Sequence, residues 1–317
     1  MSLFENFTED FLEEAAIEIL QELGYEYVFA PDISCDGEYP ERKDYREVFL
    51  EQRVKDALFR INRDLPAEAL EDAYRQIITF NSPMLEENNR YFHKLLVEGI
   101  EVSYKEKNVI RTKRAYIIDF DDMDGKKSNN EFLVVNQFTI IENEERRPDL
   151  ILFINGIPVV VIELKSASDE NVGIENAYNQ IQTYKRDIPS LFNYNAFCIL
   201  SDGINAKAGT ITSNEERFMN WRSIDGETVE PLSKPQYEVL FYGMLAKERL
   251  LDIIKNFLLF QESKEEEKDA DGNKIGDKKT IIKILAAYHQ YFAVKKAIEK
   301  TKEATREDGD RKIGVIW

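Results

Sequence analysis

The sequence predicts an α/β protein in which a mixed β-sheet is flanked by helices. One observation is a change of hydrophobic period after residue 97: apolar residues recur at helical spacing before it, and short β-branched and aromatic runs follow it. The other observation is a helical segment between the last two of these runs. Strands that first pair as neighbours and are then connected across a helix form a sheet with both antiparallel and parallel pairs.

Four helices are expected in the first hundred residues. The first follows Thr8, which can cap it, and ends at Gly24. The last is opened by Ser82, with Pro83 in its first helical position. The other expected elements are helices over residues 46–62, 66–80 and 83–97, strands over 116–120, 132–141, 150–154, 159–164 and 197–200, and a crossover helix over 174–185.

The C-terminal part has a different pattern. Helices are expected over 239–260 and 281–300, separated by an exposed charged loop over 263–279. The last residues, 313–317, form an apolar run that is typical of a buried strand. We therefore expect two domains, one over residues 1–232 and one over residues 233–317.

Composition excludes several classes of protein. The 317 residues are 43% hydrophobic, which is enough for a substantial core. They contain neither a long apolar run that could span a membrane nor a signal peptide at the start, so we expect a cytoplasmic protein without a membrane partner. Cys35 and Cys198 are expected to be buried free thiols. His93 and His289 lie far apart, which argues against a histidine-based triad or zinc site.

The charge balance is acidic, with 60 Asp and Glu residues against 42 Lys and Arg residues and a net charge of −18. Such a chain repels DNA at long range, so any contact with DNA must be local or assisted by a partner. Short basic clusters occur at 111–114, 126–127, 146–147 and 185–186. Each of them alone is more often a solvated surface than a binding site.

Two apolar strands that carry charged residues only at their outer ends indicate a candidate active site. Asp149 precedes the first strand, and Glu163 and Lys165 end the second, with a turn at Gly156 between them. A strict two-residue turn would place Asp149 opposite Ile162, on the wrong face. A three-residue connection or a bulge places Asp149 opposite Glu163, with Lys165 on the same face. The catalytic interpretation therefore requires an odd loop or a bulge.

In that register the carboxylates of Asp149 and Glu163 can hold one hard divalent cation, Mg²⁺, with the backbone carbonyl of Leu164 as a further ligand. Such an ion polarises a phosphate and lowers the pKa of a bound water. The ammonium of Lys165 would offset the charge that develops on the same phosphate. The alternative is a purely structural carboxylate–lysine ion pair at a strand end.

The pair Pro148-Asp149, followed after thirteen residues by Glu163-Leu164-Lys165, resembles the active-site motif of the PD-(D/E)xK nuclease superfamily. Gln180 and Tyr184 lie on one helical face and resemble the Gln-x-x-x-Tyr extension of a RecB-like subset of these nucleases. The resemblance implies a restriction-endonuclease-like sheet, Mg²⁺-dependent hydrolysis of DNA, and a role for Gln180 and Tyr184 in holding the site and contacting DNA. The alternative is that Tyr184 belongs to the apolar stripe of this helix, with Gln180 at its border.

Longer stretches resemble the restriction (R) subunit of type I restriction-modification enzymes. They cover residues 147–166, 176–192, 288–294 and the first helix up to Leu23-Gly24-Tyr25. The resemblance implies a type I site-specific deoxyribonuclease that acts on double-stranded DNA in a complex with modification and specificity subunits. It also implies that residues 233–317 are a helical linker and the start of a truncated RecA-like motor domain. Glu13 or Glu14 would match the accessory glutamate of many superfamily members, and we choose Glu14.

The 317 residues contain no phosphate-binding loop that ends in Gly-Lys-Ser or Gly-Lys-Thr. We therefore expect the chain itself not to bind ATP, which only the full-length protein would use. A non-catalytic adaptor of the same fold, docking DNA or a partner subunit, stays open as an alternative; it would need no Mg²⁺ near Asp149. A stand-alone repair nuclease of the same superfamily is disfavoured by the helicase-like tail. The DNA sequence recognised would be set by another subunit.

Overall fold

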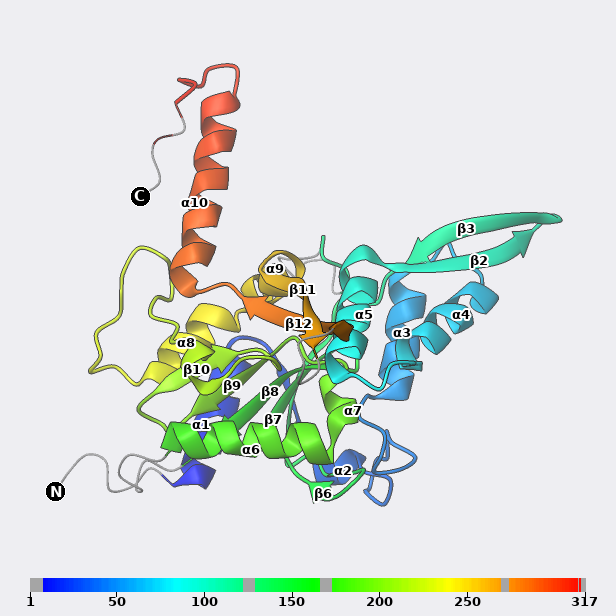
Figure 1. Ribbon diagram of the computed structural model, residues 1–317, viewed down its shortest axis with the longest axis horizontal. Coiled ribbons are helices and arrows are strands. Elements are labelled where there is room, and N and C mark those ends of the chain that lie inside the picture. Colours follow the sequence, from blue (N-terminus) through cyan, green and yellow to red (C-terminus); the bar gives the residue numbers. More distant parts are fainter. Residues whose placement is uncertain (1–7, 122–128, 166–172, 269–273, 313, 315–317) are drawn as a thin grey trace.

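A six-stranded mixed sheet forms the centre of the molecule (Figure 1). The structure is a computed structural model and describes residues 8–121, 129–165, 173–268, 274–312 and 314. The pairs β1–β4 and β8–β9 are parallel and the other pairs are antiparallel, which confirms the predicted mixed sheet. In spatial order the strands are β1 (Glu26–Phe29), β4 (Phe132–Asn136), β7 (Leu150–Ile154), β8 (Ile157–Leu164), β9 (Phe197–Ser201) and β10 (Ala206–Gly209).

Helices flank this sheet (Figure 1). The long helix α6 lies against β8 and β9, and α1 packs on α8. The helices that surround the sheet or connect its strands are α1 (Glu9–Glu22), α2 (Ala30–Ile33), α3 (Glu51–Ile61), α4 (Ala67–Ile78), α5 (Leu85–Glu98), α6 (Gly173–Asp187), α7 (Pro189–Phe192), η1 (Glu215–Arg217), α8 (Gln236–Met244) and α9 (Lys247–Asn256).

The central strands are largely apolar because both faces of the sheet are covered, and their polar residues Asn136, Glu163 and Ser201 lie at or next to strand ends. Every residue of β4, β7, β8 and β9 is buried. Charged side chains at the ends of these strands therefore lie where the strands leave the buried core. That is the position of Asp149, Glu163 and Lys165.

The strand predicted over 116–120 is wrong. Its apolar residues Ile117, Ile118 and Phe120 are buried, but the backbone is irregular. Asparagine side chains take the place of a neighbouring strand: Asn62 exchanges two hydrogen bonds of 2.7 Å with the backbone of Tyr116. The apolar run is therefore core without being sheet.

A hairpin precedes this segment, and the sequence interpretation missed it. Its strands are β2 (Ile100–Glu106) and β3 (Val109–Ala115), joined by a turn in which Lys107 and Asn108 both have positive φ, at 47° and 68°. The alternation of buried Ile100, Val102 and Tyr104 with exposed residues was the available signal. The strand predicted over 132–141 is also divided, into β4 and the short β5 (Ile140–Ile141), which pairs with β6 (Glu145–Arg146).

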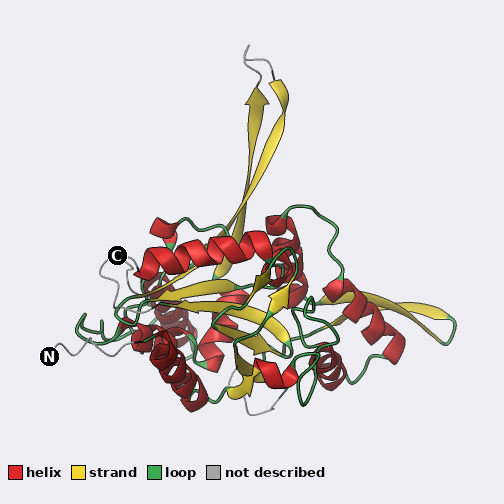
Figure 2. Cartoon of the chain, turned by 90° about the horizontal axis from the view of Figure 1, so that it is seen from below, coloured by secondary structure: helices red, strands yellow, loops and turns green. Residues whose placement is uncertain are grey.

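The C-terminal part differs most from the prediction. The helix expected over 239–260 is the pair α8 and α9, and the charged loop expected over 263–279 belongs to a long hairpin. This hairpin, β11 (Leu258–Lys268) and β12 (Lys274–Leu285), projects from the body of the molecule in Figure 2. The final helix, α10 (Tyr288–Thr305), therefore starts later than residue 281. The apolar residues at the base of the hairpin pair across its strands, as Leu258 does with Leu285. Their apolar character was wrongly interpreted as part of a helix.

Smaller differences concern helix starts and thiols. α3 begins at Glu51 instead of 46, and α5 begins at Leu85, so Pro83 precedes the helix. Cys198 is a buried free thiol as expected, but Cys35 is only partly buried.

In the part of the chain that the structure describes, no helix is long and apolar enough to cross a bilayer. Four of the last five residues, 313 and 315–317, lie outside the described residues, so the strand expected there stays a prediction.

The division after residue 232 also stays a prediction. α8 and α9 share one hydrophobic core with the sheet. The hydroxyl of Tyr25 donates to the carbonyl of Leu245 at 2.7 Å, and the Lys247 ammonium lies over the Phe132 ring. The start of a RecA-like motor is likewise an expectation that the observed elements leave open.

Candidate active site

The register of β7 and β8 determines which charged groups meet. Ile154 pairs with Ile157 across a two-residue turn, but Leu152 pairs with Val160, so β8 contains one extra residue. This bulge at Val159 moves the register by one and carries Asp149 to the position opposite Glu163. The carbonyl of Val159 accepts a 2.7 Å hydrogen bond from the backbone N–H of Ala196. The bulge that the catalytic interpretation required is present.

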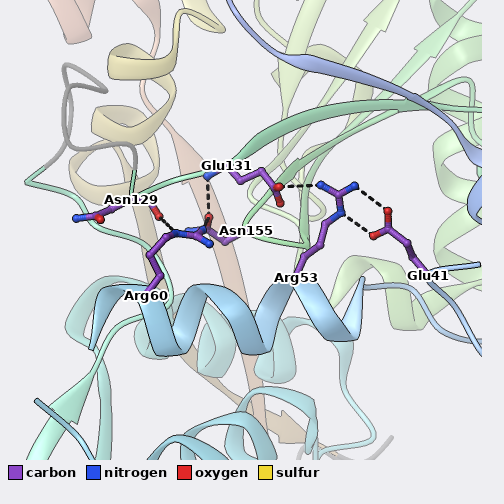
Figure 3. A network of polar contacts seen from close by, with 6 residues as sticks. All are labelled: Glu41, Arg53, Arg60, Asn129, Glu131 and Asn155. Carbon is purple, nitrogen blue, oxygen red and sulfur yellow. Dashed lines mark hydrogen bonds and ion pairs between the residues drawn. The ribbon is translucent and has the colours of Figure 1, made fainter. Parts of the chain in front are cut away.

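The turn between the two strands is held against α3. Gly156 has a φ of +80°, its carbonyl accepts from Leu50, and a Cβ there would lie 2.7 Å from the Leu50 carbonyl oxygen. Asn155 is fully buried and its side-chain oxygen accepts hydrogen bonds from the Glu131 N–H and the Arg60 guanidinium. Figure 3 shows this cluster and the neighbouring ion pairs of Arg53 with Glu41 and Glu131. The turn is therefore fixed by tertiary contacts at the end of the hairpin away from the site.

At the other end the predicted residues meet. The Glu163 carboxylate lies 2.7 Å from the Lys165 ammonium, and the Leu164 N–H donates to Asp149 Oδ2 at 2.7 Å. The Lys165 N–H donates to the Ser201 carbonyl of β9, which continues the sheet to the last residue of the motif. Asp149, Leu164, Glu163 and Lys165 thus form one cluster at the edge of the sheet.

Burial changes the acidity of both carboxyl groups. Glu163 is 1% exposed, and burial together with the nearby Asp149 charge raises its pKa to about 8. Burial raises the pKa of Asp149 to about 6, although the hydrogen bond from Leu164 opposes the shift. Burial lowers the pKa of Lys165, but the carboxylates of Glu163 and Asp149 outweigh it, and the net pKa is raised. The cluster holds more buried negative charge than one ammonium neutralises.

Gln180 and Tyr184 reach the site from α6. Tyr184 is 2% exposed, so its ring belongs to the core, but its hydroxyl donates to the Arg147 carbonyl at 3.3 Å beside Asp149. Burial and the charge of Glu163 raise the pKa of Tyr184, and the Gln180 side chain interacts with the same hydroxyl. The ring of Tyr184 therefore belongs to the apolar stripe of α6, and its hydroxyl lies at the candidate site.

The glutamate that α1 brings toward the site is Glu13, whereas Glu14 is exposed on another face. The two carboxylate oxygens of Glu13 accept hydrogen bonds of 2.7 Å from the side-chain amides of Asn136 and Gln137. Glu9, one turn earlier on the helix, lies 3.7 Å from the Lys165 ammonium. The i, i+4 spacing of Glu9 and Glu13 was the signal that would have favoured Glu13 over Glu14.

The donor set of the cluster fits a divalent cation. Glu163 Oε2 is buried and has no hydrogen-bond partner among the residues that the structure describes, an arrangement that a cation would relieve. Oxygen donors from Asp149, Glu163 and the Leu164 carbonyl would be the ligands of a hard cation. Among the described residues no group of three or more His, Cys, Asp or Glu side chains could hold a metal by itself, so a backbone carbonyl and waters would have to complete the shell.

Comparison with known proteins decides the family. Residues 6–217 match the family model described as the type I restriction enzyme R protein N terminus. The chain belongs to this R protein family. The HindI endonuclease subunit of Haemophilus influenzae is 35% identical over 314 residues, which cover 98% of this chain and 28% of that protein. The putative MjaIXP endonuclease subunit of Methanocaldococcus jannaschii is 32% identical over 333 residues, which cover 98% of this chain and 30% of that protein.

This R protein region therefore spans under a third of the HindI and MjaIXP endonuclease subunits. The EcoprrI endonuclease subunit of Escherichia coli is a further relative, 29% identical over 168 residues that cover 47% of this chain and 51% of that protein. Each of these relatives is named an endonuclease subunit of a type I restriction enzyme. The resemblance of the whole chain to the R subunit is thus confirmed.

Proposed function

We propose that this chain is the metal-dependent endonuclease module of a type I restriction enzyme, hydrolysing phosphodiester bonds of double-stranded DNA. The observation that carries the proposal is the cluster of Asp149, Glu163 and Lys165, which a bulge in β8 brings to one edge of the sheet. The names of the relatives agree with this reaction class. A bound Mg²⁺ would supply Lewis-acid stabilisation of the phosphate and a water of lowered pKa.

The residues of the chain would prepare the site in three ways. Asp149 is oriented by the hydrogen bond that its Oδ2 accepts from Leu164, and its carboxylate would be one ligand of the ion. The raised pKa of Glu163 means that ion binding must release its proton or replace Lys165 as its partner. Lys165 is then available to a phosphate oxygen, where its charge offsets the negative charge of the transition state.

Hydrolysis itself needs no covalent intermediate. A water oxygen forms a new bond to phosphorus and loses a proton to solvent, while the bond from phosphorus to the leaving oxygen breaks and that oxygen takes up a proton from solvent, which leaves a phosphate monoester and an alcohol. Tyr184 and Gln180 would keep Glu163 and the Arg147–Asp149 backbone in place. Glu13 would hold the neighbouring strand end through Asn136 and Gln137.

The wider context of the proposal rests on the resemblance to the R subunit. In the full-length R protein, this module would be joined to an ATP-driven motor, and the modification and specificity subunits would complete the complex. The chain of 317 residues lacks a phosphate-binding loop, so ATP use would belong to the rest of the protein. DNA would be delivered to an acidic module by these other parts.

Mn²⁺ calorimetry on the purified chain, combined with DNA cleavage by the assembled enzyme, tests the proposal. Glu163→Gln and Asp149→Asn should abolish saturable Mn²⁺ binding and reduce cleavage by about a hundredfold or more. Glu175→Gln, at an exposed position of α6, is the matched control and should behave as wild type. Absence of Mn²⁺ binding to the wild-type chain, with unchanged cleavage in all variants, would instead support the non-catalytic adaptor.

A further inference from the structure

The β2–β3 hairpin stands away from the rest of the molecule. Both views show it projecting beyond α3 and α4 (Figures 1 and 2). At its base Ile100, Val102 and Tyr104 of β2 and Ala115 of β3 are buried, and both strands contact α4. Every residue of β3 from Val109 to Arg114 is exposed. This ribbon, residues 100–115, therefore presents its turn and six consecutive residues of β3 to solvent.

The ribbon is basic in a strongly acidic chain. It carries five Lys and Arg side chains and two Glu side chains, whereas the whole chain has a net charge of −18. Lys105 and Lys107 form no ion pair with any described residue. Arg111 and Lys113 contact Glu106 and Asp64 in exposed pairs of 3.3 Å and 2.7 Å. Exposed pairs of this kind contribute little, so a stronger anion can replace the carboxylates.

The end of the ribbon adds a second observation. Ile110 is 76% exposed and Val109 is 54% exposed, and both lie beside the turn at Lys107 and Asn108. Across the ribbon Ile110 pairs with Lys105 and Val109 with Glu106, so these aliphatic side chains lie among the charged residues of the ribbon. They are too small an area for a stable protein interface but suit contact with sugars or base edges in a DNA groove.

We propose that the β2–β3 ribbon is a docking arm for the backbone of double-stranded DNA. A two-stranded ribbon fits the major groove, and its flanking cations would reach phosphates on either side. The identity of the polyanion as duplex DNA rests on the proposed nuclease function. The ribbon would supply the local attraction that a chain of net charge −18 otherwise lacks.

The position of the ribbon is compatible with simultaneous contact at the active site. Its base contacts α4, α4 packs on α3, and α3 holds the Asn155-Gly156 turn. The site lies at the opposite end of β8, roughly 25 Å from that turn at 3.3 Å per residue. The ribbon lies beyond that turn, so a duplex in contact with both the ribbon and the site would have to span more than about seven base pairs, since each base pair adds about 3.4 Å.

Fluorescence anisotropy with a labelled 30-base-pair duplex, in EDTA to prevent cleavage, tests the proposal on the whole chain. The ribbon variant combines Lys105→Gln, Lys107→Gln and Arg111→Gln. The matched control removes the same charge from exposed positions of α10 and its C-cap with Lys300→Gln, Lys302→Gln and Arg306→Gln. We expect the ribbon variant to bind at least tenfold more weakly, with a log–log salt slope smaller by about 3, and the control to bind as wild type. Ile110→Ser should weaken binding without changing the slope.

Several outcomes would overturn the proposal. They are no measurable binding by the wild-type chain at low salt, equal affinity of ribbon variant and wild type, or equal losses in ribbon variant and control. Loss of binding to the modification or specificity subunits with unchanged DNA affinity would show a protein-docking arm instead. Melting temperatures of both variants check that they are folded. Because binding is measured without metal, a wild-type chain that failed to bind Mn²⁺ would count against the nuclease proposal but would leave the comparison of ribbon variant and control interpretable.

Discussion

The backbone N–H of Leu164 donates a 2.7 Å hydrogen bond to the carboxylate of Asp149. The bond crosses from the start of β7 to the end of β8. It fixes the orientation of Asp149 directly beside Glu163, because Leu164 is the next residue along the strand. Two carboxyl groups are thereby held close together at a buried edge, and their mutual repulsion is part of the reason for the raised pKa of Glu163.

The acidity of this pair predicts how metal affinity depends on pH. The pKa of Glu163 is raised to about 8 and that of Asp149 to about 6, so protons compete with a cation throughout the neutral range. Mn²⁺ affinity of the chain should rise between pH 6 and 8.5, with proton release on binding, and level off above. Calorimetry in buffers of different ionisation enthalpy measures both quantities. A pH-independent affinity would show that these carboxyl groups are not the ligands.

The same shifts affect stability without metal. A carboxyl group whose folded pKa exceeds its usual value of 4.5 binds its proton more tightly in the folded state, so its contribution is lost as pH rises to 8. The free energy of unfolding of the wild-type chain in EDTA should decrease from pH 5 to pH 8. Glu163→Gln should flatten this decrease, and Glu175→Gln should not. Urea unfolding at a series of pH values provides the measurement.

Lys283 should affect stability in the opposite direction at higher pH. It is 2% exposed, its ammonium donates to Asn89 Oδ1 at 2.9 Å and the Asn195 carbonyl at 2.7 Å, and burial lowers its pKa to about 7. The unfolded state then binds the proton more tightly, so the free energy of unfolding should rise from pH 7 to pH 9, by at most about 1.4 kcal/mol per pH unit. In a Glu163→Gln background, Lys283→Met should remove this rise. If the free energy of unfolding of the double variant still rose from pH 7 to pH 9, the rise would belong to other ionisable groups.

The choice between Glu13 and Glu14 can be tested by a matched pair of variants. Glu13→Gln replaces one acceptor oxygen by an amide that faces the amides of Asn136 and Gln137, so one donor loses its partner. Cleavage by the assembled enzyme should fall about tenfold, because these residues hold the strand end beside Asp149. Glu14→Gln, one residue away and exposed, should cleave as wild type. The reverse result would restore Glu14 as the accessory glutamate.

Asn155 is predicted to be a stability determinant at a distance from the chemistry. Its side chain donates to the Ile117 carbonyl and accepts from Glu131 and Arg60, and it is fully buried. Asn155→Ala should lower the free energy of unfolding by about 3 kcal/mol, since buried partners are left unsatisfied. Asn179→Ala, on the exposed surface of α6, should change it by less than about 0.5 kcal/mol. Urea unfolding of the two variants and the wild-type chain measures these changes in the free energy of unfolding.

The sequence by itself determined the class of fold and predicted which charged residues meet at the candidate site. Buried strands covered on both faces have to be continuously apolar, so the runs before Gly156 and after it were recognisable as neighbours, and the charges at their ends were conspicuous. The motif spacing of Asp149, Glu163 and Lys165 likewise needs no coordinates. Local pattern also predicted α6, because its apolar stripe repeats at helical spacing.

Tertiary structure decided what local pattern leaves open. The bulge at Val159 accepts a hydrogen bond from Ala196, which directly precedes β9 and lies far along the chain, and this bulge places Asp149 opposite Glu163. The side chains of Asn62 and Asn155 hold residues 116–120 as irregular core, although their composition is that of a strand. Glu13 faces the site and Glu14 does not because α1 packs in one rotation against the sheet, and that rotation follows from contacts between distant segments, which short-range periodicity does not contain.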